Sequence, residues 1–282
     1  MSEVLELFGA SVTSEDPVNW AGLVADQTCP FTSRKCFKIR KSQPDVSIGT
    51  CTVSYGKEAD PVLICPNRLL ERRQIFLDSI HLLSLHEPGN ELHVVPEISI
   101  PGGSVDYFLV SARASKVRDF VGIELQTLDT TGTVWPARQR LLDYLHLPVD
   151  AADVASDKGF GMNWKMTAKT TLVQLHHKVE TFEHFSKHLV LVIQDRLLDY
   201  LKREFRFAHV GEASIGNSMH FHAYRLVAGP SGTRRLELAT RLSTDAAGIS
   251  ECLGLQAEAK LELDAILKQL EAKLSKDTLV VL

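Results

Sequence analysis

The 282-residue sequence has no long apolar stretch. Its longest aliphatic run, Leu189–Ile193, has five residues, whereas a membrane-spanning helix needs about 20. The first residues, MSEVLELF, also lack the basic and apolar regions of a secretory signal. We therefore expect no transmembrane helix and no secretion. These absences predict a cytoplasmic protein, in which the thiols stay reduced.

Repeats and a dominant charge sign are also missing. The sequence has no repeat of 20–50 residues, which argues against a solenoid. Its 31 Lys and Arg against 35 Asp and Glu give a net charge of −4, a balance that neither requires nor excludes nucleic acid. With 44% apolar and 23% charged residues, the composition is typical of a globular protein.

The hydrophobic pattern divides the chain into three regions. Residues 1–67 are polar, hold most of the cysteines and include a possible helical turn at 4–8. Residues 68–205 read as an α/β core, and residues 206–282 as a hairpin and long helix packed on that core. The predicted core elements are a helix over 68–85, strands over 91–100, 104–112 and 118–126, a helix over 167–185, a buried strand over 189–194 and a helix over 196–205.

The last region is predicted to hold a hairpin, 219–227 with 233–243, and then a helix over about 245–275. A stripe of leucines runs along that helix. Core packing and a dimer seam both explain such a stripe, and the sequence leaves the two open.

Four of the five cysteines lie within residues 29–65. Their spacing, Cys-x6-Cys-x14-Cys-x13-Cys, differs from that of common zinc ribbons. Proline follows the first and the last, and a glycine lies two residues before the third. Such residues favour tight turns, and four thiolates suit a tetrahedral Zn or Fe ion. The candidate ligands are Cys29, Cys36, Cys51 and Cys65, with four inert buried thiols as the alternative.

The cysteine segment also concentrates positive charge. Residues 28–45 carry five basic residues against one acidic residue. The segment is either a solvated loop or a loop that contacts phosphates or bases and is held rigid by the metal. The candidate DNA contacts are Arg34, Lys35, Lys38, Arg40 and Lys41.

Three carboxylates are predicted to line up across the three core strands. A hairpin turning at Pro101-Gly102-Gly103 pairs positions whose numbers sum to 203, which sets Glu97 opposite Asp106. The next hairpin pairs positions that sum to 230, which sets Asp106 opposite Glu124. Gln126, two residues further on, points to the same face as Glu124.

Like charges side by side on strands are destabilising, and a hard divalent cation such as Mg²⁺ relieves their repulsion. The trio therefore predicts a cation site. The alternative is that one of the three simply faces solvent. We interpret Asp119 and Asp129, which compete for the same role, as structural.

At these residues the sequence resembles the NotI group of type II restriction endonucleases, in the PD-(D/E)xK nuclease superfamily. The resemblance covers most of residues 28–205. Its most specific mark is a Glu-x-Gln ending, in place of the usual (D/E)xK, together with a four-cysteine zone. It rests on SVDYFLV (104–110), FVGIELQTLDTTGTVW (120–135), GMNWKMTAKTTLVQLHHK (161–178) and LVLVIQDRLLDY (189–200).

The resemblance implies an α/β fold with a restriction-endonuclease-like core, a mixed central sheet flanked by helices, and a small N-terminal four-cysteine metal-binding module. It implies that Asp106 and Glu124 bind the catalytic metal, that Glu97 is a further ligand, and that the cysteines bind a structural iron ion. Gln126 stands where the superfamily usually has a catalytic lysine. A neutral amide supplies no positive charge, so activation of water should fall on one or two metal ions.

The start of the predicted 167–185 helix offers further candidates. Asn163, Lys165 and Lys169 lie just before or within its first turns, where backbone N–H groups favour phosphate. Either lysine could also supply the positive charge that Gln126 lacks, or be an ordinary surface lysine.

Together these features predict a Mg²⁺-dependent, sequence-specific double-strand endonuclease that leaves 5′-phosphate ends. By the same resemblance it would act as a homodimer on a GC-rich palindrome, in a bacterial host with a cognate DNA methyltransferase, and without a membrane partner. The alternatives are a repair or mobile-element nuclease of the same superfamily, and an inactive DNA-binding protein stabilised by metal.

Overall fold

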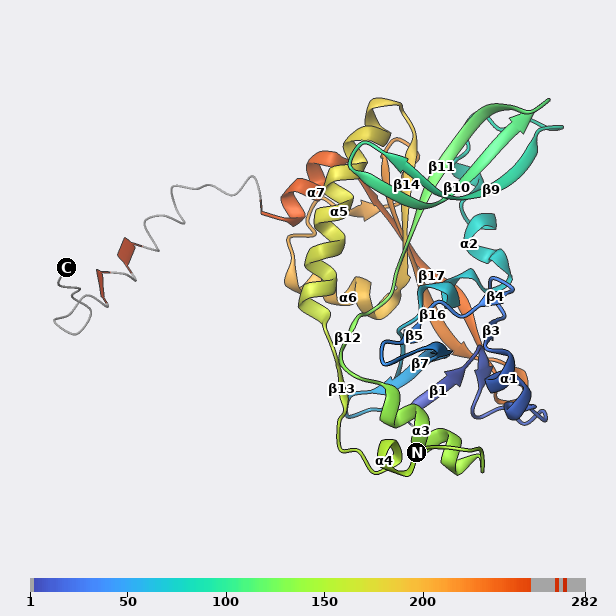
Figure 1. Cartoon of the computed structure of the whole chain (residues 1–282). Helices are drawn as coiled ribbons and strands as arrows, with labels where there is room; N and C mark the ends of the chain where they lie inside the picture. Colours follow the sequence, from blue (N-terminus) through green and yellow to red (C-terminus); the bar gives the residue numbers. More distant parts are fainter. Residues whose placement is uncertain (1–2, 255–266, 269–270, 273–282) are drawn as a thin grey trace.

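The computed structural model describes residues 3–254, 267–268 and 271–272. Its largest element is a seven-stranded sheet of order β15-β17-β16-β14-β11-β10-β9 (Figure 1). Strands β11, β14 and β16 pair in parallel and their outer neighbours pair antiparallel, so the sheet is mixed. The expected mixed α/β class is confirmed. The strands are β9 (Glu91–Ile100), β10 (Gly103–Arg113), β11 (Lys116–Gln126), β14 (His188–Gln194), β15 (Gly211–Glu212), β16 (Met219–Ala228) and β17 (Arg234–Thr244).

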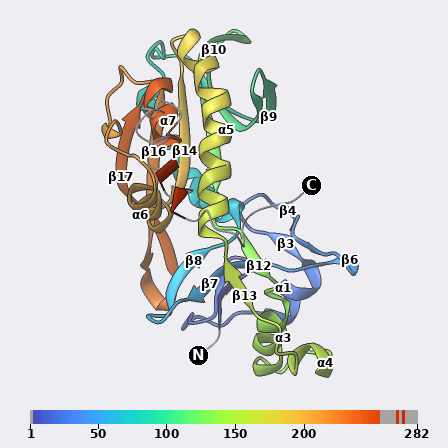
Figure 2. The same ribbon diagram turned by 90° about the vertical axis from the view of Figure 1, so that its left-hand side faces the viewer.

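Helices cover both faces of this sheet. Parallel strands need a crossover connection, and α5 (Trp164–His184) and α6 (Asp195–Glu204) lie in the crossovers that precede β14 and β16. With α7 (Ala246–Cys252) they cover one face, along which α5 runs lengthwise (Figure 2). The other face is covered by η1 (Pro66–Arg73), α2 (Gln74–Leu77) and η2 (Ile80–Leu82).

Strand β14 shows how the sequence encodes this layered core. All seven of its residues are buried. Leu189, Leu191 and Ile193 join the cluster under α5, α6 and α7, whereas Val190 and Val192 join the cluster under η1 and α2. A strand covered on both faces is expected to be apolar throughout, and the prediction of a buried strand here is confirmed.

The prediction of one helix over 68–85 is wrong. The chain forms short helical pieces instead, because Glu71 has extended dihedral angles and Arg72 and Arg73 have φ values of +51° and +56°. The physical cause is the buried side chain of Arg68, which is held by Glu6 and Glu71. The pair with Glu6 ties the first turn of η1 to β1, and the pair with Glu71 lies within η1, at the residue where the dihedral angles leave the helical region.

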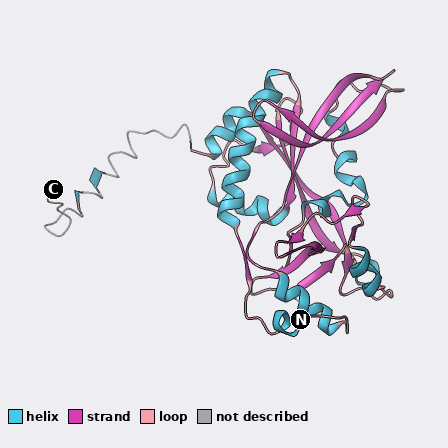
Figure 3. Ribbon diagram, viewed as in Figure 1, coloured by secondary structure: helices cyan, strands magenta, loops and turns pink. Residues whose placement is uncertain are grey.

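The N-terminal region has a four-stranded sheet of order β2-β1-β7-β8, built from β1 (Val4–Leu7), β2 (Ala10–Ser11), β7 (Thr50–Tyr55) and β8 (Asp60–Leu63) (Figure 3). The helical turn expected at 4–8 is wrong, because β1 pairs with β7 along its length. Short elements complete the region: α1 (Trp20–Asp26), β3 (Thr28–Cys29), β4 (Arg34–Lys35), β5 (Ile39–Arg40) and β6 (Gln43–Ser47).

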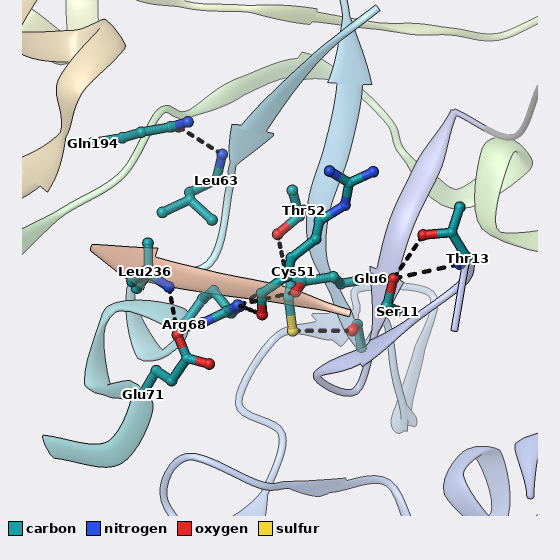
Figure 4. A network of polar contacts seen from close by, with 12 residues as sticks. Glu6, Ser11, Thr13, Cys51, Thr52, Leu63, Arg68, Glu71, Gln194 and Leu236 are labelled. Carbon is teal, nitrogen blue, oxygen red and sulfur yellow. Dashed lines mark hydrogen bonds and ion pairs between the residues drawn. The ribbon is translucent and has the colours of Figure 1, made fainter. Parts of the chain in front are cut away.

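A buried polar network fastens this small sheet to the large one (Figure 4). Arg68, 1% exposed, donates to both carboxylate oxygens of Glu6 on β1 and to the backbone oxygen of Arg234 on β17. Gln194, at the end of β14, accepts from the backbone N–H of Leu63 and donates to the oxygen of Pro61. The two sheets are therefore joined by buried hydrogen bonds.

The C-terminal hairpin belongs to the large sheet, since β16 pairs with β14 and β17 pairs with β16. Between its strands lies η3 (Pro230–Gly232), at the predicted loop. The described part of the expected final helix is α7, and most of the leucine stripe falls outside the described residues. No described helix is long and apolar enough to cross a membrane.

Four remaining elements connect β11 to α5. These are β12 (Thr130–Gly132), α3 (Trp135–Tyr144), α4 (Ala151–Val154) and β13 (Phe160–Met162). Strand β12 pairs with β13, and this brings the chain back from the α3–α4 excursion to the start of α5. The N-terminal end of α5 is thereby placed beside the segment that follows β11.

Candidate functional site

The strand register places Asp106 next to Glu124. Each pair of β10 with β9 sums to 203, and the Asp106 position lies between the pairs Val105–Ile98 and Tyr107–Pro96. On the other side, Tyr107 pairs with Ile123 in a register that sums to 230. One step further along the same register lies Asp106 opposite Glu124. The register expected from the two turns is therefore present.

Glu124 lies on the face of β11 that α5 covers. Phe120, on the same face, is 6.3 Å from Phe182 of α5 between ring centroids. Between Phe120 and Glu124 the strand has Gly122, where a Cβ would lie 2.3 Å from the Phe182 ring. The glycine allows the aromatic ring to pack directly on the backbone. The helix consequently approaches β11 closely along this face.

Helix α5 runs antiparallel to β11, and contacts between the two recur at matching spacings along both. Phe182 lies over Gly122, Lys178 contacts Glu124, and Thr167 contacts Asp129. Four residues of helix advance about 6 Å, and two residues of strand advance about 6.6 Å. A four-residue spacing on α5 therefore matches a two-residue spacing on β11, which places Lys178 over Glu124 once Phe182 is seated.

Lys178 is the residue that the sequence interpretation missed. Its Nζ lies 2.6 Å from Glu124 Oε1 and 2.5 Å from the backbone oxygen of Ser104, and its side chain is only 8% exposed. Lys165 and Lys169, proposed for the positive charge beside the carboxylates, are exposed near the start of α5. Lys169 is nine residues before Lys178, about 13 Å along the helix. The lysine that contacts the carboxylates in this structure is Lys178, and Lys165 and Lys169 stay candidates for phosphate contact at the start of α5.

The turn between β9 and β10 makes room for this part of α5. Gly102 has a φ of +92°, and a Cβ there would lie 2.1 Å from the backbone oxygen of His177. A Cβ on Gly103, φ +132°, would lie 3.2 Å from Cε of Lys178. Glycine is the residue that tolerates both the dihedral angle and the approach. The turn thus sets the strand register and admits the lysine.

Burial shifts the protonation of both carboxylates upward. Desolvation raises the pKa of Glu124 to about 7, with Asp106 adding to the shift and Lys178 opposing it. Burial also raises the pKa of Asp106, while a hydrogen bond from the backbone N–H of Leu125 to Oδ2, 2.8 Å, opposes the shift. Two carboxyls that resist ionisation side by side gain from a cation that favours their charged forms.

Glu97 and Gln126 make no hydrogen bond to Asp106 or Glu124 among the described residues. Glu97 occupies the position opposite Asp106, but its side chain is exposed and its φ is +50°. A non-glycine residue with positive φ inside a strand is unusual, and its charge raises the pKa of Asp106. Gln126 donates its side-chain N–H to the backbone oxygen of Thr127, 2.6 Å away. Its amide is directed to the chain's own backbone.

A pocket of about 10 Å³ lies beside Glu124. That volume corresponds to about one water molecule. Polar groups from both elements reach it, including Gln126 from β11 and Gln174 and Lys178 from α5. The half-buried Glu124 carboxylate therefore faces a small polar space as well as the lysine.

The donor set at these carboxylates fits a hard divalent cation. Asp106 Oδ1 and Glu124 Oε2 accept no hydrogen bond from any described residue, since the contacts to the two groups go to Oδ2 and Oε1. Carboxylate oxygens are the ligands that Mg²⁺ prefers. The lysine ammonium shows that the site already attracts a positive charge. In residues 3–254 as they stand, His, Cys, Asp and Glu form no group of three or more arranged to hold a metal ion.

The four clustered cysteines are all buried and unbridged. The Cys51 thiol donates to the backbone oxygen of Gly49 at 3.5 Å, and its interaction with Cys65 lowers the pKa of Cys65 to about 6. Burial raises the pKa of the Cys36 thiol, and the charges of Cys65 and Cys29 add to that shift. Cys36 therefore feels the charges of Cys65 and Cys29, and Cys65 interacts with Cys51. Their donor chemistry suits a soft, tetrahedral metal ion, although they are not closed into a metal-binding group in the part of the chain described here.

Part of the basic segment is engaged within the protein. Arg40 forms an ion pair with Asp153 at 3.1 Å and lies over the Trp135 ring. Lys38 donates to the backbone oxygen of Ile64, and Lys35 donates to that of Asp45. Arg34 and Lys41 are exposed. Nucleic acid could reach Arg34, Lys35 and Lys41 most directly.

Asn163 is the N-cap residue of α5, and its side chain makes no capping hydrogen bond. The helix therefore begins with backbone N–H groups that a phosphate could accept. Lys165 and Lys169 are exposed in the turns that follow. The expected phosphate contacts at this end of α5 are geometrically accessible.

Comparisons with protein-family models, with curated proteins and with solved structures find no match for this chain.

Proposed function

We propose that the protein is a Mg²⁺-dependent DNA endonuclease of the type II restriction kind. It hydrolyses phosphodiester bonds in double-stranded DNA and leaves 5′-phosphate ends. The observation that carries the proposal is the pairing of Asp106 and Glu124 on neighbouring strands, each with an oxygen that no described residue fills. A hard cation bound between them would lower the pKa of a water molecule and stabilise the phosphate in the transition state.

The chain's own residues supply the rest of the site. Asp106 and Glu124 would hold the cation, with Glu97 near enough to contribute from the exposed edge strand. The small pocket beside Glu124 and Gln126 is the place for the attacking water. Exposed basic residues at 34–41 and at the start of α5 would contact the DNA phosphates.

The proposal includes a homodimer on a palindromic site. One chain carries one Asp106–Glu124 pair, which serves one strand, so two chains related by a two-fold axis would cut both strands of a palindrome. The resemblance favours a GC-rich site and a partner methyltransferase that protects the host. Light scattering with DNA should give two chains per duplex, and a 1:1 complex that makes clean double-strand breaks would contradict the dimer.

Incubation with plasmid DNA and Mg²⁺ tests the function. Discrete fragments with 5′-phosphate and 3′-hydroxyl ends are the expected result. A smear would favour the repair or mobile-element nuclease instead. DNA binding in a gel-shift assay without any cutting would favour the inactive DNA-binding protein.

We further propose that Cys29, Cys36, Cys51 and Cys65 bind one structural Fe or Zn ion. Their burial and mutual electrostatic influence support it. Four protein ligands leave no open position for substrate, so this ion would hold the segment in place. Elemental analysis before any chelator is added should give about one equivalent of Fe plus Zn per chain. Less than about half an equivalent, with four thiols that titrate in the native protein, would contradict the site.

A further inference from the structure

We infer that Lys178 of α5 is a catalytic residue that takes the role left open by Gln126 on β11. This inference rests on the proposed nuclease function and adds a residue that neither the Glu-x-Gln ending nor the resemblance assigns. The carboxylates come from the sheet, and the positive charge comes from the helix that covers it.

The position of the ammonium supports this role. Lys178 Nζ is 2.6 Å from Glu124 Oε1, and Glu124 stands next to Asp106 across the sheet. The ammonium therefore lies at the border between the carboxylates and the small pocket that Gln126 also lines. Asp106 and Glu124 would hold the cation, and a phosphate oxygen drawn to that cation would lie within reach of the same ammonium.

The hydrogen-bonding capacity of Lys178 also leaves room for substrate. An ammonium has three N–H donors. One goes to Glu124 and one to the backbone oxygen of Ser104, and no other described residue accepts the third. The two contacts fix the ammonium on a nearly buried side chain, and the third donor stays free for an anion.

Gln126 cannot take this role from its present position. Its amide carries no charge, and one of its two N–H donors is bonded to the Thr127 oxygen. A lysine at 126 would follow Glu124 by two residues and would share its face of β11. A lysine at 126 would therefore approach the small pocket from the strand, and Lys178 approaches the same pocket from the helix.

The reaction balances with Lys178 as an electrostatic partner. The water oxygen forms a bond to phosphorus, and the P–O3′ bond breaks with its electron pair on the 3′ oxygen. The water releases one proton to solvent, and the 3′ oxygen takes one proton from solvent. Lys178 keeps its own protons throughout. It stabilises the negative charge that develops on the phosphate oxygens, which is the kind of contribution that preorganised charges make to catalysis.

The test compares single-turnover cleavage by wild type, Lys178→Met and Lys178→Gln at saturating Mg²⁺. Both variants should cleave about 100-fold more slowly or worse. The Gln variant can still donate to Glu124 and to the Ser104 oxygen, so it covers the case in which the Met variant does not fold. Adding Gln126→Lys to either variant should restore at least about tenfold, because the charge returns from the strand.

A measurement without cleavage separates catalysis from simple charge balance. With Ca²⁺ in place of Mg²⁺, the variants should bind cognate DNA within about threefold of wild type. Isothermal titration should show that they bind Ca²⁺ at least as tightly as wild type, since a competing cation has left Glu124. Lys187→Met, which removes the partner of Asp119 at the far end of β11, is the matched control and should cleave normally when folded.

The outcomes are distinct. If wild type fails to cut DNA with any divalent ion, the proposed function fails. If wild type cuts and Lys178→Met or Lys178→Gln cuts at the wild-type rate, the role of Lys178 is overturned and the nuclease stands. A slow variant that Gln126→Lys does not improve, and that has lost Ca²⁺ binding, would make Lys178 a structural residue and would also overturn the inference.

Discussion

Strand β11 carries two lysine–carboxylate pairs with the same 2.6 Å separation and different surroundings. At one end, Asp119 is 1% exposed, and both of its oxygens are occupied. Oδ2 accepts from the backbone N–H of Leu85, and Oδ1 accepts from Lys187 and from the N–H of Phe120. At the other end, Glu124 has Lys178 on Oε1 and no described partner on Oε2.

This difference distinguishes a structural ion pair, at Asp119, from a candidate cation-binding site, at Glu124. A buried carboxylate with both oxygens occupied gains little from a further ligand. A half-buried carboxylate with one oxygen unfilled and a second carboxylate beside it gains from a bound cation. The number of carboxylate oxygens that accept a hydrogen bond therefore distinguishes Asp119 from Glu124. The lysine–carboxylate distance does not, because it is the same in both pairs. The sequence interpretation of Asp119 as structural agrees with these contacts.

The largest expected effect is on cleavage. Glu124→Gln or Asp106→Ala should lower the cleavage rate by at least about 1,000-fold while DNA binding persists or strengthens, because a ligand and a repulsive charge are both removed. Asp119→Asn should keep the wild-type rate per folded molecule. Parallel cleavage and gel-shift assays measure this, and wild-type cutting by Glu124→Gln would remove the distinction between the two pairs.

The effect on stability should be larger for the Asp119 variant than for the Glu124 variant, the reverse of the effect on cleavage. Asp119→Asn leaves Lys187 without its charged partner, and breaking a buried pair costs about 3–5 kcal/mol. Glu124→Gln also leaves a lysine without its charged partner, but it should cost less, because Glu124 accepts one hydrogen bond where Asp119 accepts three and burial already weakens its ionisation. Urea unfolding in the presence of EDTA gives both values. An equal loss of unfolding free energy in the two variants would mean that the number of occupied carboxylate oxygens does not distinguish the two ion pairs.

The same reasoning extends to two buried histidines on β16. Both ring nitrogens of His222 and Nδ1 of His220 are buried without a partner in the described chain. Burial lowers the pKa of His220 to about 4 and that of His222 to about 3. The unfolded chain binds these protons near pH 6.5, so stability should fall as the pH falls from about 6.5 towards 4.

At pH 5 each of these histidines should lower the free energy of unfolding by about 2 kcal/mol. His222→Leu removes its share of this loss, and the variant should keep more of its neutral-pH stability than wild type does. Urea titrations at pH 5 and pH 7 measure the difference. Parallel losses in wild type and variant would show that His222 is not the group responsible.

The smallest expected effect is stabilisation by the ion itself. Mg²⁺ at about five times its Kd should raise the free energy of unfolding by about 1 kcal/mol. The gain should vanish in Glu124→Gln and persist in Asp119→Asn, because the former loses a ligand and the latter does not. Thermal melts with and without Mg²⁺ give the comparison. A gain that survives in Glu124→Gln would place the ion elsewhere.

The sequence predicts the strand side of the site better than the helix side. The position of Asp106 beside Glu124 follows from two turns and the two-residue period of strands, and both are local. Lys178 depends on how α5 is seated over β11, which is tertiary information. A usable signal was present: Gly122-x-Glu124 on the strand matches Lys178 and Phe182, four apart on the helix, in reverse order. That match can be used only once α5 is known to pack against β11.

The broken helix over 68–85 was missed for a related reason. Its apolar spacing suits a continuous helix, but Arg68 is bound to Glu6, more than 60 residues earlier in the chain. Local periodicity carries no record of that ion pair. The N-terminal strand at Val4–Leu7 likewise takes its form from β7, which lies far along the sequence.

The turn at 101–103 has a consequence for how this protein can vary. Surface turns are usually where chains accept insertions and deletions. Here the length of the turn fixes the sum that pairs β10 with β9, and one added residue would shift Asp106 from its position opposite Glu97. A side chain at Gly102 would meet α5 as well. Among proteins that share this site, we expect both the length of the turn and its first glycine to be held constant, as if the loop belonged to the core.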